Sequence, residues 1–460
     1  MRHHYNPRKK QRFKLYLSLA IVAAAVLYVT FSPHFEREAP AVKLAKPLYW
    51  NLIEPMPIEL NDNIGLKSYR VTMTIGENRT VLIEGSAEGN QSLTLGVRHP
   101  PVRTLPEGAA KLEIEVTDTS LWRFFQGNRT LHVSDLILDR HNPTVNLIGH
   151  SYGIAPGGSA AVVFEAHDEH LKTLHVVTKN GASFEAAPFY KEGFYVALIA
   201  RDLLDRDFVA HVLATDEAGN QTRVRVPLFL KEVRYRQSNI TLSEMFLKGK
   251  IDDLHYQFDA QGRDKSLSGV EKFLFVNEVL RRANDELVAT RTQGVLNEGV
   301  KEFAIEPFAP LPNGAVVAHF GDRRDFYYDK KRISHSYHLG IDLASVKEAV
   351  VYSTNPGTVV FVGDNGIYGN MPIVHHGLGL YSVYGHSTRV DVKEGQKIGP
   401  KAALGTTGVS GLALGDHLHF ELRVQGIAVT PLEWMDRAWI KTNITKVMED
   451  AKNIIKGREG

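Results

Sequence analysis

The chain of 460 residues contains no cysteine. This absence excludes disulfide bonds, thiolate metal sites and a cysteine nucleophile, so any metal ligand must come from His, Asp or Glu. Neither sign of charge is in large excess, because the formal net charge is only +2. No basic stripe follows the first residues, and we therefore expect no nucleic-acid partner. The length predicts roughly two to four domains.

The N-terminus combines a basic tail with an apolar run. Residues 1–14 carry several basic side chains and no acidic one, and residues 15–31 carry no charge. This order predicts a cytoplasmic tail and a single-pass transmembrane anchor in the inner (cytoplasmic) membrane, with the rest of the chain in the periplasm or exterior. A cleaved signal peptide is the alternative, but residues 32–37 contain no small-x-small cleavage site.

Alternating strands are expected after a linker. Residues 32–48 contain prolines and mixed charge, which predicts a linker. From residue 49 to 232, apolar and polar residues alternate in short stretches such as Lys111–Thr117. Alternation of this kind predicts half-buried strands.

A faint internal repeat divides this β region. Thr117-Asp118 is echoed by Thr215-Asp216, and turn residues follow the second copy. Copies about a hundred residues apart match the size of small β-sandwiches. We therefore expect two immunoglobulin-like β-sandwich domains, at 49–141 and 142–232, with one larger β domain as the alternative. Such domains would offer a surface to an envelope protein partner.

The next segment, residues 233–310, predicts a helical connection. Two stretches, 242–247 and 270–291, place apolar residues at spacings of three and four. Side chains such as Phe273 need cover from another element. We expect the segment to pack on the back of the neighbouring sheet or, alternatively, beside its groove, where it would gate substrate entry.

Residues 311–435 predict an all-β unit. Short strands such as 357–363, 380–384 and 418–423 are separated by glycine turns. Helical periodicity returns afterwards, and residues 436–460 predict a C-terminal helix.

Five side chains in this unit suggest chemistry. His338 and Asp342 stand four residues apart, which places them on one face of a strand or helix. His417 and His419 alternate in a strand, so both imidazoles point to one side, and His386 ends another strand. Singly, each motif is typical of a surface pair or a structural histidine. Together they supply what a catalytic zinc site requires, namely three protein ligands, a base and an oxyanion donor.

Further motifs surround these residues. The HxxxD motif at 338–342 is followed by a strand ending in Tyr384-Gly-His386, a Gly-Thr-Thr-Gly turn at 405–408 and the run His417-Leu-His-Phe-Glu421. In this combination, about residues 311–435 resemble the LytM/lysostaphin-type zinc metallopeptidases. The resemblance implies a small, mostly antiparallel β-sheet with its site in a groove.

The resemblance also implies residue roles. His338, Asp342 and His419 would bind Zn2+, and His386 and His417 would be the catalytic pair that polarises water and stabilises the oxyanion. The fold class expected for the chain is mainly β, with an N-terminal transmembrane helix, two immunoglobulin-like β-sandwich domains, a helical segment and a C-terminal LytM-like antiparallel β catalytic domain.

The expected activity follows from the same resemblance. It implies a zinc metalloendopeptidase that hydrolyses peptide cross-links of peptidoglycan, with stem peptides as substrates; a protein substrate is a further alternative. Some relatives have lost their zinc residues, so a non-catalytic envelope scaffold or an activator of cell-wall amidases is the alternative from another class. This chain keeps every ligand position. Asp416 stands where many relatives have proline, and we expect it to be solvated.

Overall fold

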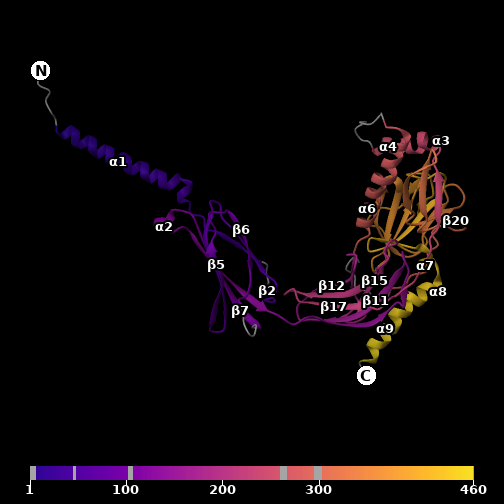
Figure 1. The fold of residues 1–460 in the computed structure, drawn as a ribbon, viewed down its shortest axis with the longest axis horizontal. Coiled ribbons are helices and arrows are strands. Elements are labelled where there is room, and N and C mark those ends of the chain that lie inside the picture. The colour runs from indigo at the N-terminus through magenta and orange to yellow at the C-terminus, as the bar shows by residue number, and fades with distance from the viewer. Residues whose placement is uncertain (1–6, 45–47, 102–106, 259–266, 295–302, 459–460) are drawn as a thin grey trace, which may run out of the picture. The chain divides into compact units, whose positions relative to one another are not determined.

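Strands dominate the computed structural model, which describes residues 7–44, 48–101, 107–258, 267–294 and 303–458 (Figure 1). The prediction of a mainly β chain is therefore confirmed. The chain divides into two compact units. The first comprises Met1–Asn142 with Asp216–Asn220, and the second comprises Pro143–Thr215 with Gln221–Gly460.

The first unit begins with an apolar helix, α1, at Pro7–Phe31. Its segment Lys10–Phe31 is long and apolar enough to cross a membrane, and none of it is buried against the protein. The helix is compatible with a signal sequence or an anchor. The remaining elements of the unit are η1 Pro33–Phe35, β1 Ala41–Lys43, β2 Tyr49–Trp50, β3 Met56–Asn61, β4 Leu66–Ile75, β5 Asn78–Ser86, β6 Ser92–Val97, β7 Gly108–Asp118, α2 Trp122–Phe125 and β8 Arg129–Leu138.

Two sheets of the first unit share one core. A three-stranded sheet has the order β1-β3-β6, and a five-stranded sheet has the order β2-β8-β7-β4-β5. Strand β7 buries alternate residues, including Leu112 and Ile114, and these join Ile58 and Leu60 of β3 in one apolar cluster. The alternation predicted from the sequence thus forms the inner face of a two-sheet structure.

The second unit starts with two four-stranded sheets of similar size. Their orders are β14-β15-β11-β9 and β13-β12-β16-β17, and β10 pairs with β18. The strands are β9 Thr144–His150, β10 Gly153–Ile154, β11 Ser159–His167, β12 Leu171–Thr178, β13 Ser183–Glu185, β14 Ala187–Pro188, β15 Phe194–Ala200, β16 Ala210–Asp216, β17 Gln221–Val226 and β18 Phe229–Leu230.

The internal repeat has a structural counterpart at the ends of β7 and β16. Asn128 donates from its backbone N and its Nδ2 to the two carboxylate oxygens of Asp118, both at 2.8 Å. Asn220 repeats both hydrogen bonds to Asp216, at 2.8 and 2.7 Å. The domain limits 49–141 and 142–232 remain a prediction.

An eight-stranded sheet carries the third part of the chain. Its order is β20-β23-β31-β27-β26-β25-β29, and β32 pairs with β31. A smaller sheet has the order β24-β30-β28. The strands are β20 Ala315–Ala318, β21 Arg323–Tyr328, β22 Lys331–Tyr337, β23 Ile341–Ala344, β24 Val350–Ser353, β25 Gly357–Asp364, β26 Asn370–His375, β27 Leu380–Gly385, β28 Arg389–Val390, β29 Lys397–Ile398, β30 Ala402–Thr406, β31 Leu418–Val424 and β32 Ile427–Val429.

Helices cover one face of this sheet (Figure 1). Phe273, Val276 and Leu280 pack in one cluster with Tyr381 and Val383 of β27. The helical elements are α3 Glu244–Phe246, η2 Leu247–Ile251, α4 Asp252–Phe258, α5 Gly269–Leu274, η3 Phe275–Leu280 and α6 Arg281–Arg291.

The covered face is the face that carries His419 of β31. Val383 lies opposite Glu421, and Gly385 lies opposite His419. Residues directly opposite in antiparallel strands share a face. The expectation that the helices pack on the back of the sheet is therefore wrong. Gating by the helices remains a prediction.

One part of the predicted helical segment is a strand. Gln237–Thr241 forms β19, which pairs in parallel with β21, and β21 pairs with β22. The segment 233–310, expected to be a helical connection, therefore also contains a strand, which lies outside the two stretches predicted to be helices. Ser and Asn in this stretch give no helical apolar stripe, and the pairing partner lies far along the chain.

The other face of the large sheet shares a core with the two four-stranded sheets of the second unit. Phe420 and Leu422 of β31 belong to the same apolar cluster as Phe164 of β11. The C-terminal helices, which complete this core, are α7 Pro431–Met435, α8 Arg437–Ile440, η5 Lys441–Thr445 and α9 Lys446–Gly457.

Candidate metal centre and groove

Strand pairing brings the HxxxD and HxH motifs together. Asp342 of β23 lies directly opposite His419 of β31. Gly340, just before β23, allows the close approach, because a Cβ there would lie 2.5 Å from the Phe420 carbonyl oxygen and 2.8 Å from the His419 ring. The glycine inside HxxxD is therefore a packing requirement of the site.

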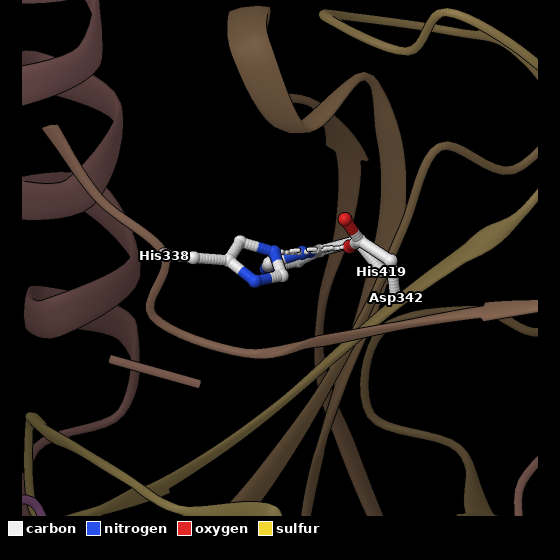
Figure 2. A group of neighbouring side chains, drawn as sticks. All are labelled: His338, Asp342 and His419. Atoms are coloured by element: carbon white, nitrogen blue, oxygen red, sulfur yellow. Dashed lines mark hydrogen bonds and ion pairs between the residues drawn. The ribbon is translucent and has the colours of Figure 1, made fainter. Parts of the chain in front are cut away.

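Three donor atoms converge at this point. His338 Nε2 lies 3.0 Å from Asp342 Oδ1 and 3.1 Å from His419 Nδ1, and His419 Nδ1 lies 3.0 Å from Asp342 Oδ1. Figure 2 shows the three side chains directed at one another. Three lone-pair atoms this close repel one another unless a proton or a metal ion lies among them.

The donor set fits zinc. Ligand atoms at about 2.0 Å from a tetrahedral zinc are separated by about 3.3 Å, close to the spacing seen here. Two imidazoles and one carboxylate are also typical ligands of a catalytic zinc, whereas calcium and magnesium prefer oxygen. His338, Asp342 and His419 are therefore the residues that could hold this metal.

Neighbouring groups orient the two histidine donors. His338 Nδ1 lies 3.0 Å from the carbonyl oxygen of His319, so this nitrogen donates and Nε2 is directed to the site. His419 Nε2 lies 3.5 Å from Glu421 Oε2, which leaves Nδ1 for the site. Glu421 is fully buried and accepts from Arg423 Nε at 2.7 Å. Carboxylate and carbonyl partners of this kind fix the tautomer of metal-binding histidines.

His386 and His417 stand beside these donors. Their ring centroids lie 4.7 Å apart, and His417 Nε2 lies 3.7 Å from Asp342 Oδ1. His386 Nδ1 donates to the Ser410 carbonyl at 2.8 Å, and His417 Nδ1 donates to the Gly415 carbonyl at 2.7 Å. Both rings thus keep Nε2 available for a substrate or a water molecule.

The charge states follow from burial and from contacts within the cluster. Burial favours the neutral acid, but hydrogen bonds from His338 and His419 hold the pKa of Asp342 well below its usual range. Burial, opposed by Asp342, lowers the pKa of His338. Burial also lowers the pKa of His386, and the nearby His419 and His417 lower it further. His386 is therefore neutral at neutral pH and can accept a proton.

The five predicted residues line one cavity of about 540 Å³. The helical segment and β19 contribute to its wall, through Arg281, Asp285 and Ser238 among others. Tyr368, which follows β25, donates to Asp285 Oδ1 at 2.7 Å. A position of the helical segment beside the groove was one of the two alternatives predicted from the sequence, whereas the part played by β19 was not predicted.

Two further residues of the site, Glu421 and Arg423, could have been predicted from the sequence. Glu421 and Arg423 alternate with His419 along β31, so these three side chains share a face, and His417 directly precedes the strand. From the sequence, Glu421 is only the last residue of the run 417–421 and has no assigned role. Its place two residues after a metal-ligand candidate was the signal that could have identified its supporting role.

Other polar residues have structural partners. His375 is buried at the end of β26 and accepts from Gly379 N at 3.3 Å; burial lowers its pKa to about 4. Asp416 is not simply solvated as expected, because its two oxygens accept from Thr407 Oγ1 at 2.5 Å and from Glu348 N at 3.1 Å. It ties the loop before β31 to neighbouring loops.

Residues 336–431 match the sequence model of Peptidase family M23. These residues form an M23 peptidase domain. The resemblance to the LytM/lysostaphin-type peptidases is therefore confirmed for this part of the chain.

Named proteins share the M23 region. DD-carboxypeptidase/endopeptidase Mpg of Neisseria meningitidis serogroup B is 33% identical over 109 residues, covering 23% of this chain and 25% of that protein. Murein hydrolase activator NlpD of Salmonella typhimurium is 34% identical over 131 residues, covering 27% of this chain and 30% of that protein. The alignments thus span less than a third of each relative.

A solved structure also matches this region. The catalytic domain of the antimicrobial peptidase lysostaphin from Staphylococcus simulans is 22% identical and aligns with a TM-score of 0.24. The alignment covers 27% of this chain and 92% of that structure.

Proposed function

We propose that this protein is a zinc-dependent endopeptidase that hydrolyses peptide cross-links of peptidoglycan. The observation that carries the proposal is the convergence of His338 Nε2, Asp342 Oδ1 and His419 Nδ1 within 3.1 Å of one another. His386 and His417 line the same cavity, and each ring uses Nδ1 for a backbone carbonyl, so its Nε2 is directed away from that bond. Three ligands and two uncommitted imidazoles are the parts that a hydrolytic zinc site requires.

The side chains have separate tasks in this mechanism. A zinc ion in such a site supplies a Lewis acid that polarises water and the peptide carbonyl. A neutral imidazole of the His386–His417 pair accepts a proton at Nε2 from the attacking water. A ring that has gained this proton donates it to the departing amine. The other ring donates a hydrogen bond from Nε2 to the developing oxyanion when it is the imidazolium, which carries a proton on both nitrogens.

The printed names of the relatives support the substrate class. Mpg is named a DD-carboxypeptidase/endopeptidase, and Peptidoglycan DD-endopeptidase ShyA of Vibrio cholerae is 32% identical over 118 residues. A peptide bond between D-residues, as in peptidoglycan stem peptides, is therefore the bond class we propose. The apolar helix α1 is proposed to anchor the chain in the inner membrane, with the M23 domain outside the cytoplasm.

Metal analysis and digestion test this proposal together. Zinc-loaded full-length protein in detergent is expected to hold about one zinc per chain and to cut the cross-links of sacculi, so that a later muramidase digest yields monomeric in place of cross-linked muropeptides. Asp342→Ala should lose both properties. His335→Ala, which alters an exposed histidine of β22 outside the donor set, is the matched control and should keep both. Zinc-loaded wild-type protein that leaves cross-links intact would contradict the proposal.

A second function is favoured by one relative, the murein hydrolase activator NlpD. Under this alternative the protein stimulates a cell-wall amidase, and the sandwich sheets hold an envelope partner. The two functions differ in their metal requirement. An activator should stimulate a purified amidase equally well as wild type and as Asp342→Asn, whereas the peptidase should lose its activity in that variant.

A further inference from the structure

Arg281 enters the catalytic cavity without a carboxylate of its own. It is the first residue of α6, and its Nε donates to Asn277 Oδ1 at 3.2 Å. Within the described residues, no carboxylate oxygen comes within the 4.0 Å that defines an ion pair with this guanidinium. Burial lowers the pKa of Arg281, and the charge of the nearby Asp285 opposes this shift only in part.

A second arginine stands on the same cavity wall. Arg324 of β21 places Nη2 at 3.5 Å from Asp342 Oδ2, the oxygen that does not face the two histidines. Arg281 and Arg324 together line both the catalytic cavity and a neighbouring cavity of about 410 Å³. Two guanidinium groups that share a partly desolvated space repel each other unless an anion lies between them.

The acidic groups of this wall are already engaged. Asp322 accepts from Ser238 Oγ at 2.8 Å and lies 3.6 Å from Arg324 Nε. Asp285 accepts from the Tyr368 hydroxyl, and burial raises the pKa of Asp285, opposed by the charge of Arg281. Asp342 belongs to the metal centre. Asp285, one turn further along α6, acts on Arg281 through its charge, but no described carboxylate pairs with this guanidinium directly, which leaves its N–H groups for an anionic ligand.

We propose that Arg281 and Arg324 form a carboxylate-binding subsite, which selects peptides that carry a free carboxylate beside the scissile bond. The proposal rests on the proposed peptidase function and specifies its substrate. Arg324 touches a metal-ligand candidate, so a carboxylate held there lies within about one residue of the reacting carbonyl. In a D-alanyl bond to D-alanine, or to the D-centre of a diamino acid, the carbon that bears the amide nitrogen carries such a carboxylate. Planar guanidinium groups match this group with paired hydrogen bonds.

Ligand binding tests the subsite without turnover. The probe is N-acetyl-D-alanyl-D-alanine with its central amide replaced by a CH2–NH link, compared with the same molecule as its terminal carboxamide. Calorimetry on zinc-loaded wild-type protein should show roughly 10- to 100-fold tighter binding of the carboxylate, because charge-assisted hydrogen bonds are lost with the carboxamide. Equal affinity for the two probes would overturn the proposal, and this comparison needs no variant.

Variants locate the preference. Arg281→Gln should bind both probes with similar, weak affinity while retaining its zinc. Arg282→Gln is the matched control, because Arg282 is the exposed neighbour on α6 and does not line the catalytic cavity. A preference that survives in Arg281→Gln would show that Arg281 does not bind the carboxylate.

Hydrolysis separates this proposal from the proposed function. Wild-type protein is expected to cleave D-alanyl muropeptides with a free carboxylate at 10-fold or higher kcat/KM than their carboxamides, chiefly through KM. Preferential binding without hydrolysis of either form would uphold the subsite and refute the peptidase. Hydrolysis of both forms at equal kcat/KM would uphold the peptidase and refute the subsite. An equal loss for both forms in Arg281→Gln would assign the arginine to the transition state instead.

Discussion

Glu421 should control zinc affinity although it is no ligand. It is fully buried, lies 3.5 Å from His419 Nε2 and is held by Arg423 at 2.7 Å. Glu421→Gln keeps the size of the side chain but removes the negative charge that orients and polarises His419. Changes to such supporting carboxylates typically lower metal affinity by ~10- to 100-fold, or about 1.4–2.7 kcal/mol.

Removal of the whole side chain should also destabilise the fold. Glu421→Ala leaves the guanidinium of Arg423 buried with an exposed fraction of only 4%. Breaking a buried ion pair from one side costs about 3–5 kcal/mol. The double variant Glu421→Gln with Arg423→Met restores charge balance, so it should unfold at a higher denaturant concentration than Glu421→Ala while still binding zinc weakly.

The assay has two parts and one control. Competition with a chromogenic chelator gives the zinc affinity, and denaturant unfolding of the metal-free protein gives the stability. Glu394→Gln is the control, because Glu394 forms an exposed pair with Arg291 at 3.9 Å and should change stability by less than about 1 kcal/mol. Wild-type zinc affinity in Glu421→Gln would refute the orienting role, and unchanged stability in Glu421→Ala would refute the buried-pair argument.

Three further predictions concern catalysis, pH and topology. His386→Ala and His417→Ala should keep about one zinc per chain yet lose ~10²–10⁴-fold in turnover; near-wild-type rates in either variant would remove that histidine from the mechanism. Burial raises the pKa of Glu433 from its usual 4.5 to about 8. The folded state therefore holds the proton more tightly, and stability should be full below pH 4.5 and fall by a few kcal/mol up to about pH 8. Denaturant unfolding should show this slope in wild-type protein and a flatter profile in Glu433→Gln. Reporter enzymes fused after Glu38 should be exported and remain membrane-bound, whereas a mature N-terminus near residues 30–40 would show cleavage instead.

The sequence by itself determined the local patterns. Apolar alternation along β7 and β31 predicted strands, because side chains of a strand point to opposite faces in turn. The same rule placed His417 and His419 on one side. The charge-free run 15–31 predicted the apolar helix, because an uninterrupted apolar stretch of this length is typical of a membrane-spanning helix. Each of these inferences depends only on neighbours in the chain.

Only the tertiary structure decided which distant segments meet. The pairing of Asp342 with His419 depends on strand order, which short-range patterns do not encode. The parallel pairing of β19 with β21 adds a strand to a segment that the sequence predicted to be a helical connection. The helices cover the histidine-bearing face and bring Arg281 into the cavity beside Arg324, because their apolar stripe packs on Tyr381 and Val383. Periodicity shows that a helix has an apolar face, but the surface that buries that face is set by the packing of the whole domain.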